Sequence, residues 1–157
     1  MKAILDSGAY TAFTKGVKID IERYIEFNKK YEGVFEGGSI NLDVIGNAEK
    51  SYKNWKILQR AGVHTIPVYH LGTEEKWLLK YMEQTEYIAI GAIANLHTKA
   101  RLLGLDHVWK THLLDAEGKP KLKVHGLGLT AFDVVSRYPW YSVDSAIAVK
   151  TAAFGGV

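Results

Sequence analysis

Short runs rich in Val, Ile and Tyr alternate along this chain with segments of helical periodicity, and this alternation limits the folds that it can adopt. The strand-like runs, bounded by Gly or Pro, are residues 2–5, 39–45, 64–70, 86–93, 121–128 and 140–145. The helix-like segments are residues 20–32, 47–61, 73–84, 97–114 and 130–137. Strands that alternate with helices form parallel sheets through right-handed crossovers, so the expected fold class is α/β.

Several of the expected helices have recognisable capping residues at their ends. Asp20 and Asn47 stand at N-terminal cap positions, and Gly62 stands at the position of a C-terminal cap. Thr130 and Asp133 have the spacing of a capping box. These residues predict where the helices begin and end.

About six parallel strands are compatible with a doubly wound open sheet or with part of a (β/α)8 barrel. A complete barrel needs eight strands and usually about 200 residues or more, whereas this chain has 157. No Pro-rich linker, low-complexity segment or internal repeat divides the sequence. We therefore expect a single domain that spans residues 1–157.

The sequence contains no cysteine, which excludes disulfide bonds, thiolate catalysis and zinc sites with cysteine ligands. The formal net charge of +3 is compatible with a nucleic-acid substrate but does not require one. No apolar run approaches the roughly 20 residues of a membrane helix, and Asp6 comes too early for a secretory signal peptide. These features predict a cytoplasmic protein with no membrane partner.

Polar residues and a glycine fall at or near the carboxyl ends of the expected strands, where parallel α/β folds form their active face. In chain order they are Asp6, Asp43, His70, Gly91, His125 and Asp144. Taken singly, an Asp after a strand often caps a turn or the next helix, and a single histidine is more often structural than catalytic. Three acids and two histidines at equivalent positions predict a functional site.

Several familiar motifs are absent from the sequence. It contains no phosphate-binding loop, no nucleophile elbow and no HxH or HExxH metal pair. The GLG at residues 126–128 does not match a dinucleotide fingerprint. Asp6, His70 and His125 could still bind a hard metal ion from separate strands.

Five segments resemble, in the same order, the motifs of the tRNA-guanine transglycosylases. LDSGAYTAF (5–13) is similar to the DSGGFQ strand end of that family, and NLDVIG (41–46) corresponds to its second acid, on a later strand. YIAIGAI (87–93) resembles the Gly-rich GGLAVGE stretch, KVHGLGLT (123–130) the MGVG strand and YSVDSA (141–146) the FDCV segment. Together the five segments extend along nearly the whole chain.

The resemblance is closer to the short transglycosylase-like proteins of bacteriophages, which are relatives of the DNA 7-deazaguanine transglycosylases. The segments that carry it are IPVYH (66–70), VHGLG (124–128) and YPWYSVDS (138–145). The resemblance implies a TIM-barrel-like fold, here an incomplete or minimal (β/α)8 barrel. The family places one or two βα units before its DSG motif, so it also implies a barrel entered partway round. A phage-encoded protein would act in the host cytoplasm.

The function that the resemblance implies is that of a pentosyltransferase that exchanges bases in nucleic acid. Guanine is replaced by a 7-deazaguanine derivative through a covalent glycosyl-enzyme intermediate, and no cofactor or metal takes part. Asp144 corresponds to the nucleophile, Asp6 to the general acid/base and Asp43 to the residue that binds the Watson–Crick edge of the base. Paired carboxylates suit displacement at a sugar carbon, and a carboxylate suits the N–H donors of guanine.

The other residues implied to bind substrate are Ser7, Gly8, Tyr10, His70, Gly91, His125 and Tyr141. Gly8 permits a tight turn beside a flat base, and Tyr10 stands where the family has its stacking Phe. The backbone around Gly91 would contact the base, and Trp140 or Tyr141 could stack on it. The implied partners are nucleic acid and a free 7-deazaguanine base.

The sequence also departs from the tRNA enzymes. Without cysteines it lacks their structural zinc subdomain, which favours DNA over tRNA as the substrate. IAVKTAA (147–153) replaces the PTR motif that follows the family's nucleophile.

Two alternatives therefore remain open. One is a metal-dependent TIM-barrel hydrolase that uses Asp6, His70, His125 and Asp144. The other is a non-catalytic barrel fragment that binds nucleic acid. An unclosed barrel would expose sheet edges, which a homodimer could cover.

Overall fold

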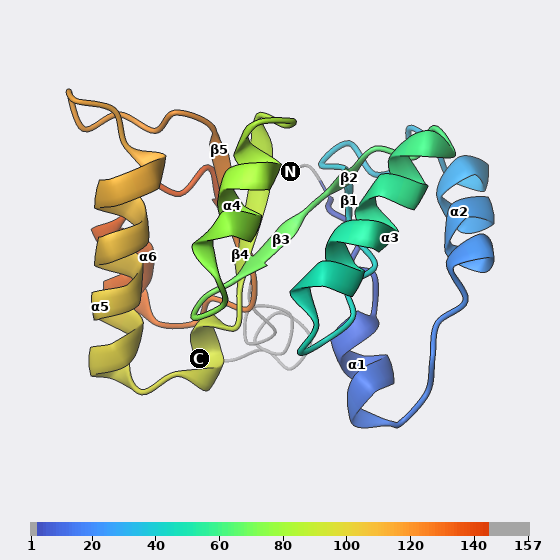
Figure 1. Ribbon diagram of the computed structural model, residues 1–157, viewed down its shortest axis with the longest axis horizontal. Helices are drawn as coiled ribbons and strands as arrows, with labels where there is room; N and C mark the ends of the chain where they lie inside the picture. The colour runs from blue at the N-terminus through green and yellow to red at the C-terminus, as the bar shows by residue number, and fades with distance from the viewer. Residues whose placement is uncertain (1–2, 145–157) are drawn as a thin grey trace, which may run out of the picture. The chain divides into compact units, whose positions relative to one another are not determined.

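The structure is a computed structural model of the chain and describes residues 3–144. It divides into two compact units, the first ending at Val68 and the second beginning at Tyr69. Helices alternate with parallel strands that form one two-stranded and one four-stranded sheet (Figure 1). The prediction of an α/β fold with parallel strands is confirmed.

The first unit contains three helices and the two-stranded sheet. Its elements are α1 (Ala9–Thr14), α2 (Ile21–Lys30), β1 (Ser39–Ile40), α3 (Ala48–Arg60) and β2 (Thr65–Ile66). β1 pairs with β2, and on its other side Ser39 forms a single parallel bridge with Leu5. The expected first strand, whose Lys2 lies outside the described residues, is therefore represented by one bridge.

The helix ends of the first unit follow the sequence closely. The Asp20 carboxylate accepts a hydrogen bond from the Glu22 N–H at 2.8 Å, and the Asn47 side chain accepts one from the Lys50 N–H at 2.9 Å. Gly62 follows α3 with a φ of 82°, a left-handed conformation that glycine adopts without strain. The predictions for these three residues are confirmed.

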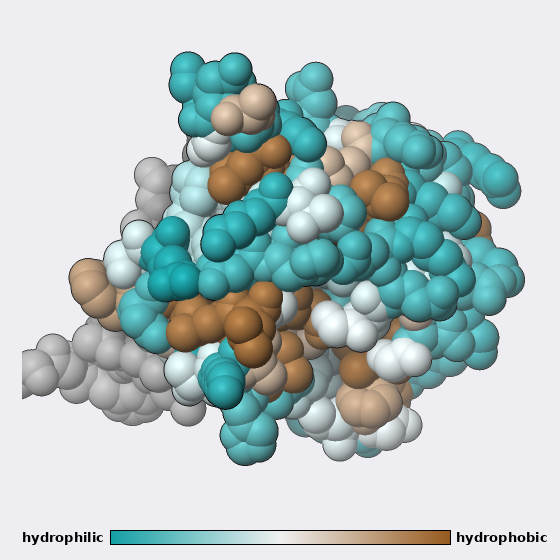
Figure 2. Space-filling model, turned by 60° about the vertical axis from the view of Figure 1, so that its left-hand side comes forward, coloured by the Kyte–Doolittle hydropathy of each residue, from teal (hydrophilic) through white to brown (hydrophobic). Residues whose placement is uncertain are grey.

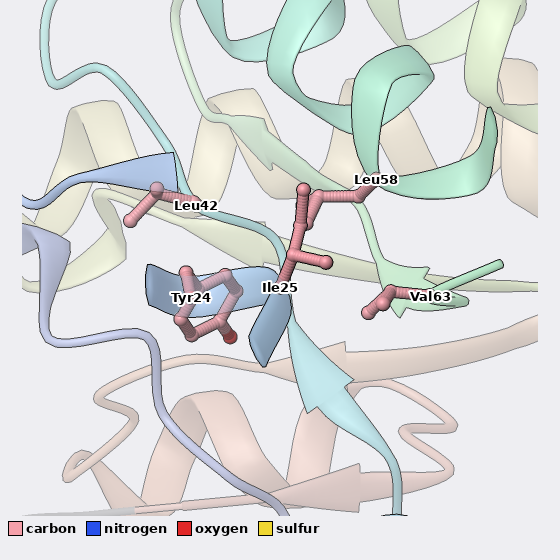
Figure 3. Packing of buried hydrophobic residues seen from close by; sticks show 5 residues of the cluster. All are labelled: Tyr24, Ile25, Leu42, Leu58 and Val63. Atoms are coloured by element: carbon pink, nitrogen blue, oxygen red, sulfur yellow. The ribbon is translucent and has the colours of Figure 1, made fainter. Parts of the chain in front are cut away.

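Hydrophobic side chains from both long helices fill the core of the first unit (Figure 3). Tyr24 and Ile25 of α2 pack with Leu58 of α3, and Leu42 and Val63 complete the cluster. Leu58 is 0% exposed. The helical spacing of these residues gives each helix one apolar face, and burial of that face holds the unit together.

Apart from Val68, the first residue of β3, the four-stranded sheet lies in the second unit, in the order β3-β4-β5-β6. The elements of this unit are β3 (Val68–His70), α4 (Glu75–Met82), β4 (Tyr87–Gly91), a 3₁₀ turn η1 (Ile93–Asn95), α5 (Thr98–Val108), a π-helical turn η2 (Trp109–Leu113), β5 (Lys123–Gly126), α6 (Phe132–Arg137) and β6 (Ser142–Val143). In the register of the sheet, Ala89 lies opposite His125, and His125 lies opposite Ser142.

The structure differs from the sequence predictions at several ends of elements. The strand expected over residues 64–70 is divided at Pro67, which has no N–H to donate to a sheet. α6 begins two residues after Thr130 and has no side-chain cap, so the capping-box prediction is wrong. α1 was not expected, and Ser145, the end of the last expected strand, lies outside the described residues.

Aromatic side chains form part of the core of the second unit. The rings of Trp109 and Tyr138 stack with centroids 5.9 Å apart, and Trp140 meets Trp109 edge-on at 5.2 Å. The Trp140 indole N–H donates to the Val134 carbonyl at 3.1 Å. Gly126 lies beneath this layer, where a Cβ atom would come within 2.1 Å of the Leu129 side chain. The half-buried Trp140 thus packs against the core residue Trp109.

On the face that Figure 2 shows, the surface is largely hydrophilic with separate hydrophobic areas. No helix among residues 3–144 has both the length and the apolar character needed to cross a membrane.

Candidate functional site

A hydrogen-bonded chain of side chains connects three strands of the second unit. Nδ1 of His125, on β5, lies 2.7 Å from the hydroxyl oxygen of Ser142, on β6. The same hydroxyl lies 2.9 Å from the hydroxyl of Tyr87, on β4. His125 and Ser142 are opposite each other in the register, so their side chains share one face of the sheet.

Asp144 follows β6 at its carboxyl end, beside the carboxyl end of β5. Its Oδ1 accepts a hydrogen bond from the Gly128 N–H at 2.8 Å and lies 3.5 Å from Nε2 of His125. The Asp144 side chain is 54% exposed, whereas that of His125 is 2% exposed. The site therefore presents a carboxylate to solvent and supports it with a buried imidazole.

The Asp144 carboxylate beside Nε2 of His125 favours one arrangement of protons, because an anion repels a bare nitrogen lone pair. If Tyr87 donates to Ser142 and Ser142 donates to Nδ1 of His125, the imidazole proton lies on Nε2, which faces Asp144. Nε2 is buried, and no described residue lies within hydrogen-bond geometry of it. The nearby carboxylate oxygen, at 3.5 Å, is then its electrostatic partner.

This environment keeps the Asp144 carboxylate ionised. Burial alone would raise the pKa of Asp144, but the contacts with His125 and with the Gly128 N–H outweigh it, and the net shift is downward. Burial raises the pKa of Tyr87. At neutral pH, Asp144 is therefore an anion and Tyr87 keeps its phenolic proton.

Two of the predicted acids lie in the first unit. The Asp6 carboxylate accepts a hydrogen bond from the Gly8 N–H at 3.3 Å. Gly8 has a φ of 70° and begins α1, and the buried Ser7 hydroxyl accepts from the Ala9 N–H at 3.4 Å. Asp6 thus stabilises the turn after its strand, and its carboxylate is exposed to solvent.

Asp43 lies near the same buried phenol as Asp6. The Tyr24 hydroxyl donates to the Ile40 carbonyl at 2.6 Å, and burial, with added repulsion from Asp6 and Asp43, raises the pKa of Tyr24 to about 12. The Asn41 side-chain amide donates to Asp43 Oδ1 at 2.8 Å. Asp6 and Asp43 thus both act on the pKa of the same buried phenol.

The remaining predicted residues differ in position. His70 and Gly91 end the neighbouring strands β3 and β4, and the Leu71 N–H donates to the Gly91 carbonyl at 3.1 Å. Tyr10 lies on α1 with 58% of its surface exposed. The side chains of His70 and Tyr10 and the backbone around Gly91 remain candidates for binding substrate. His125 is buried, so we expect it to act through Asp144 rather than by touching substrate.

Tyr141 lies just before β6, at the amino end, whereas Asp144 follows the carboxyl end. Three residues of extended chain span about 10 Å. The Tyr141 ring meets Tyr87 edge-on at 5.5 Å and has the Lys123 amine 5.0 Å from its centre. Tyr141 and Lys123 line a depression of about 520 Å³. This position does not favour stacking on a base held at Asp144.

Sequence reasoning missed several polar partners of the predicted residues. Ser142 could have been found, because it stands two residues before Asp144 and alternate residues of a strand share a face. Tyr87 and Tyr24 carried no such signal, because their roles depend on which strands and helices pack together.

One group of described residues has the spacing of metal ligands. Glu75, His107 and His112, all in the second unit, have ligand atoms within 4.8 Å of one another. Hydrogen bonding to His112 contributes most to lowering the pKa of Glu75, burial opposes it, and His107 adds to the lowering. None of the three belongs to the residue set of the alternative metal-dependent hydrolase.

No protein-family model, curated protein or solved structure matches this chain. The class that the fold and the site define is an α/β protein with parallel sheets and a carboxylate–imidazole pair at the carboxyl end of a strand.

Proposed function

We propose that this protein is a base-exchange transglycosylase that replaces guanine in nucleic acid, DNA rather than tRNA, by a 7-deazaguanine derivative. Asp144 is the nucleophile and Asp6 the general acid/base. Asp43 binds the Watson–Crick edge of the base, and Ser7, Gly8, Tyr10, His70 and Gly91 contribute to binding it. The proposal includes a TIM-barrel-like arrangement of the strands, with homodimerisation as a means of covering exposed edges.

The environment of Asp144 is the observation that carries this proposal. A carboxylate nucleophile must be ionised and accessible, and Asp144 combines a lowered pKa with 54% exposure. Both described contacts involve Oδ1, so Oδ2 is the oxygen that we expect to attack. Gly128 and His125 hold the carboxylate in one orientation, which favours a defined line of attack.

The proposed reaction has two displacements at the same carbon. Asp144 Oδ2 forms a bond to C1′ of the sugar while the bond from C1′ to N9 of guanine breaks, and guanine leaves with a proton from Asp6. The incoming base then gives its N9 proton to Asp6, and its N9 displaces the Asp144 carboxylate from C1′. Two inversions retain the configuration of the sugar.

The test is nucleoside mass spectrometry of DNA and tRNA from cells that express the full chain and are supplied with 7-deazaguanine precursors. We expect 7-deazaguanine nucleosides in DNA with the wild-type protein and none with Asp144→Asn. Removal of one essential group of an enzyme typically lowers the rate by several orders of magnitude. Asp133→Asn, an exposed acid on α6, is the matched control and should retain full exchange.

Full exchange by Asp144→Asn would contradict the nucleophile role. Modified nucleosides in tRNA alone would contradict the choice of DNA, and their absence from both nucleic acids would contradict the function. Circular dichroism of each purified variant checks that the fold is retained.

A further inference from the structure

Glu75, His107 and His112 form a cluster in the second unit that the proposed function does not use. Nε2 of His107 lies 2.6 Å from Oε1 of Glu75, and Nε2 of His112 lies 2.6 Å from Oε2 of the same carboxylate. Glu75 is the first residue of α4, His107 lies near the end of α5 and His112 lies in η2. The cluster thus connects α4 with the α5–η2 helix.

The π-helical turn explains how the two histidines reach one carboxylate. Residues five apart in an α-helix point about 140° away from each other, because each residue turns the helix by about 100°. In η2 the Leu114 N–H instead donates to the Trp109 carbonyl, five residues earlier, at 3.0 Å. The wider turn brings the His107 and His112 rings to a centroid distance of 6.1 Å. Such turns often occur at functional sites.

The donor atoms suit a transition metal. Two imidazole nitrogens and one carboxylate oxygen form a ligand set typical of zinc sites that keep a fourth position for water. The ligand atoms lie within 4.8 Å of one another, so small side-chain movements would bring all three to zinc-ligand distances of about 2.0–2.2 Å. We propose that Glu75, His107 and His112 bind one zinc ion.

The surroundings of the cluster support this proposal. The side chains of Glu75 and His107 are 39% and 55% exposed, so an ion can enter from solvent. The side chain of His112 is only 13% exposed. The Thr111 hydroxyl lies 3.4 Å from Nδ1 of His107. Its oxygen can accept a hydrogen bond from Nδ1–H, which leaves Nε2 to bind the metal, as outer partners of zinc-bound histidines commonly do.

Zinc would change how α4 is attached to α5 and η2. In the structure, hydrogen bonds from the two imidazoles to Glu75 form this attachment. A zinc ion would take the place of the two Nε2 protons and would bind the same three side chains directly. Because zinc would bind only the folded state, added zinc should raise the melting temperature of the chain.

Isothermal titration calorimetry of the full chain, treated with a chelator and then titrated with zinc chloride, tests the proposal. We expect one zinc ion per chain, and at least tenfold weaker binding for each of Glu75→Gln, His107→Gln and His112→Gln. His64→Gln, which changes an exposed histidine in the first unit, is the matched control and should bind zinc as the wild type does. Cobalt in place of zinc should give the visible absorption of a four-coordinate site in the wild type and in His64→Gln.

Absence of zinc binding by the wild type would overturn the proposal and leave the cluster as a hydrogen-bonded connection between helices. Equal affinity of all four variants would also overturn it, because the ion would then bind elsewhere. His112 is largely buried, so His112→Gln could unfold the chain. In that case the zinc binding of Glu75→Gln and His107→Gln, at exposed positions, would decide the proposal, with circular dichroism as the check on folding.

Discussion

The catalytic proposal depends in part on a buried side chain, because His125 contributes to the lowered pKa of Asp144. Burial of an acid normally raises its pKa, yet that of Asp144 is lowered by His125 and by the Gly128 N–H. The imidazole in turn is positioned by Ser142 and Tyr87. We therefore regard His125 as a positioning residue for Asp144.

The first prediction at the scale of residues concerns His125→Gln. Loss of the imidazole should raise the pKa of Asp144, as measured by ¹³C NMR titration of its carboxyl carbon. A group whose pKa is lowered by folding stabilises the folded state above its unfolded pKa, and this contribution is lost as the pH falls through the folded value. His125→Gln should therefore make the unfolding free energy less dependent on pH in the acidic range.

His64→Gln is the control for this titration and should leave the Asp144 pKa unchanged. An unchanged Asp144 pKa in His125→Gln would show that the Gly128 N–H alone maintains the anion.

Short-range signals in the sequence worked well at these positions. Asp6 has the turn role that is common after a strand, because its carboxylate accepts a hydrogen bond from the Gly8 N–H, while its predicted role as general acid/base stays a prediction. Tyr141 lies just before β6 and Asp144 just after it, and Tyr141 lines a depression, so its predicted role in binding substrate stays a prediction.

Two helices of the first unit, α2 and α3, have N-terminal caps that the sequence predicts. Ser, Thr, Asp and Asn at the N-terminal cap satisfy backbone N–H groups that have no partner within the helix. Asn47 makes such a bond at α3, whereas His97, at the equivalent position of α5, makes no side-chain bond.

The prediction at the scale of elements compares these two caps. Asn47→Ala should lower the unfolding free energy by about 0.5–2 kcal/mol, because the Lys50 N–H loses its partner. His97→Ala removes no capping bond and should cost less. Urea denaturation followed by circular dichroism measures both. An equal loss in the two variants would mean that the Asn47 bond contributes nothing to stability.

The ends of the other helices could not be read in the same way. Thr130 and Asp133 have the spacing of a capping box, but α6 begins at Phe132, so neither residue occupies the position that the motif requires. The π-helical turn η2 also gave no local signal. The sequence predicts only one longer helix over residues 97–114, whereas the structure has a π-helical turn at Trp109–Leu113.

The chain as a whole forms two compact units, whereas the sequence predicts one domain over residues 1–157. Leu58 is 0% exposed in the core of the first unit, and Leu105 is 0% exposed in the second. A single domain unfolds in one cooperative step, so a defect in either core lowers the stability of the whole.

The prediction at this scale uses Leu58→Ala and Leu105→Ala. Each should lower the unfolding free energy by about 2–5 kcal/mol, since each removes buried methyl groups and leaves a cavity. Each variant should shift the same single unfolding transition, and tryptophan fluorescence and circular dichroism should both follow that transition. Ile57→Ala, at an exposed neighbour of Leu58, is the control and should change stability much less. Two separate transitions, each moved by one variant only, would contradict the single domain.

The sequence by itself determined the features that depend on neighbours within a few positions. These are the alternation of strands and helices, the caps at Asp20 and Asn47, and the placement of acids at strand ends. Only the tertiary structure decided which distant side chains meet. Tyr87 and Ser142 are 55 residues apart and join through the register of β4, β5 and β6. Glu75 and His112 are 37 residues apart and meet because a π-helical turn redirects the chain. Strand register and helix packing are set by burial over the whole unit, so no local pattern contains them.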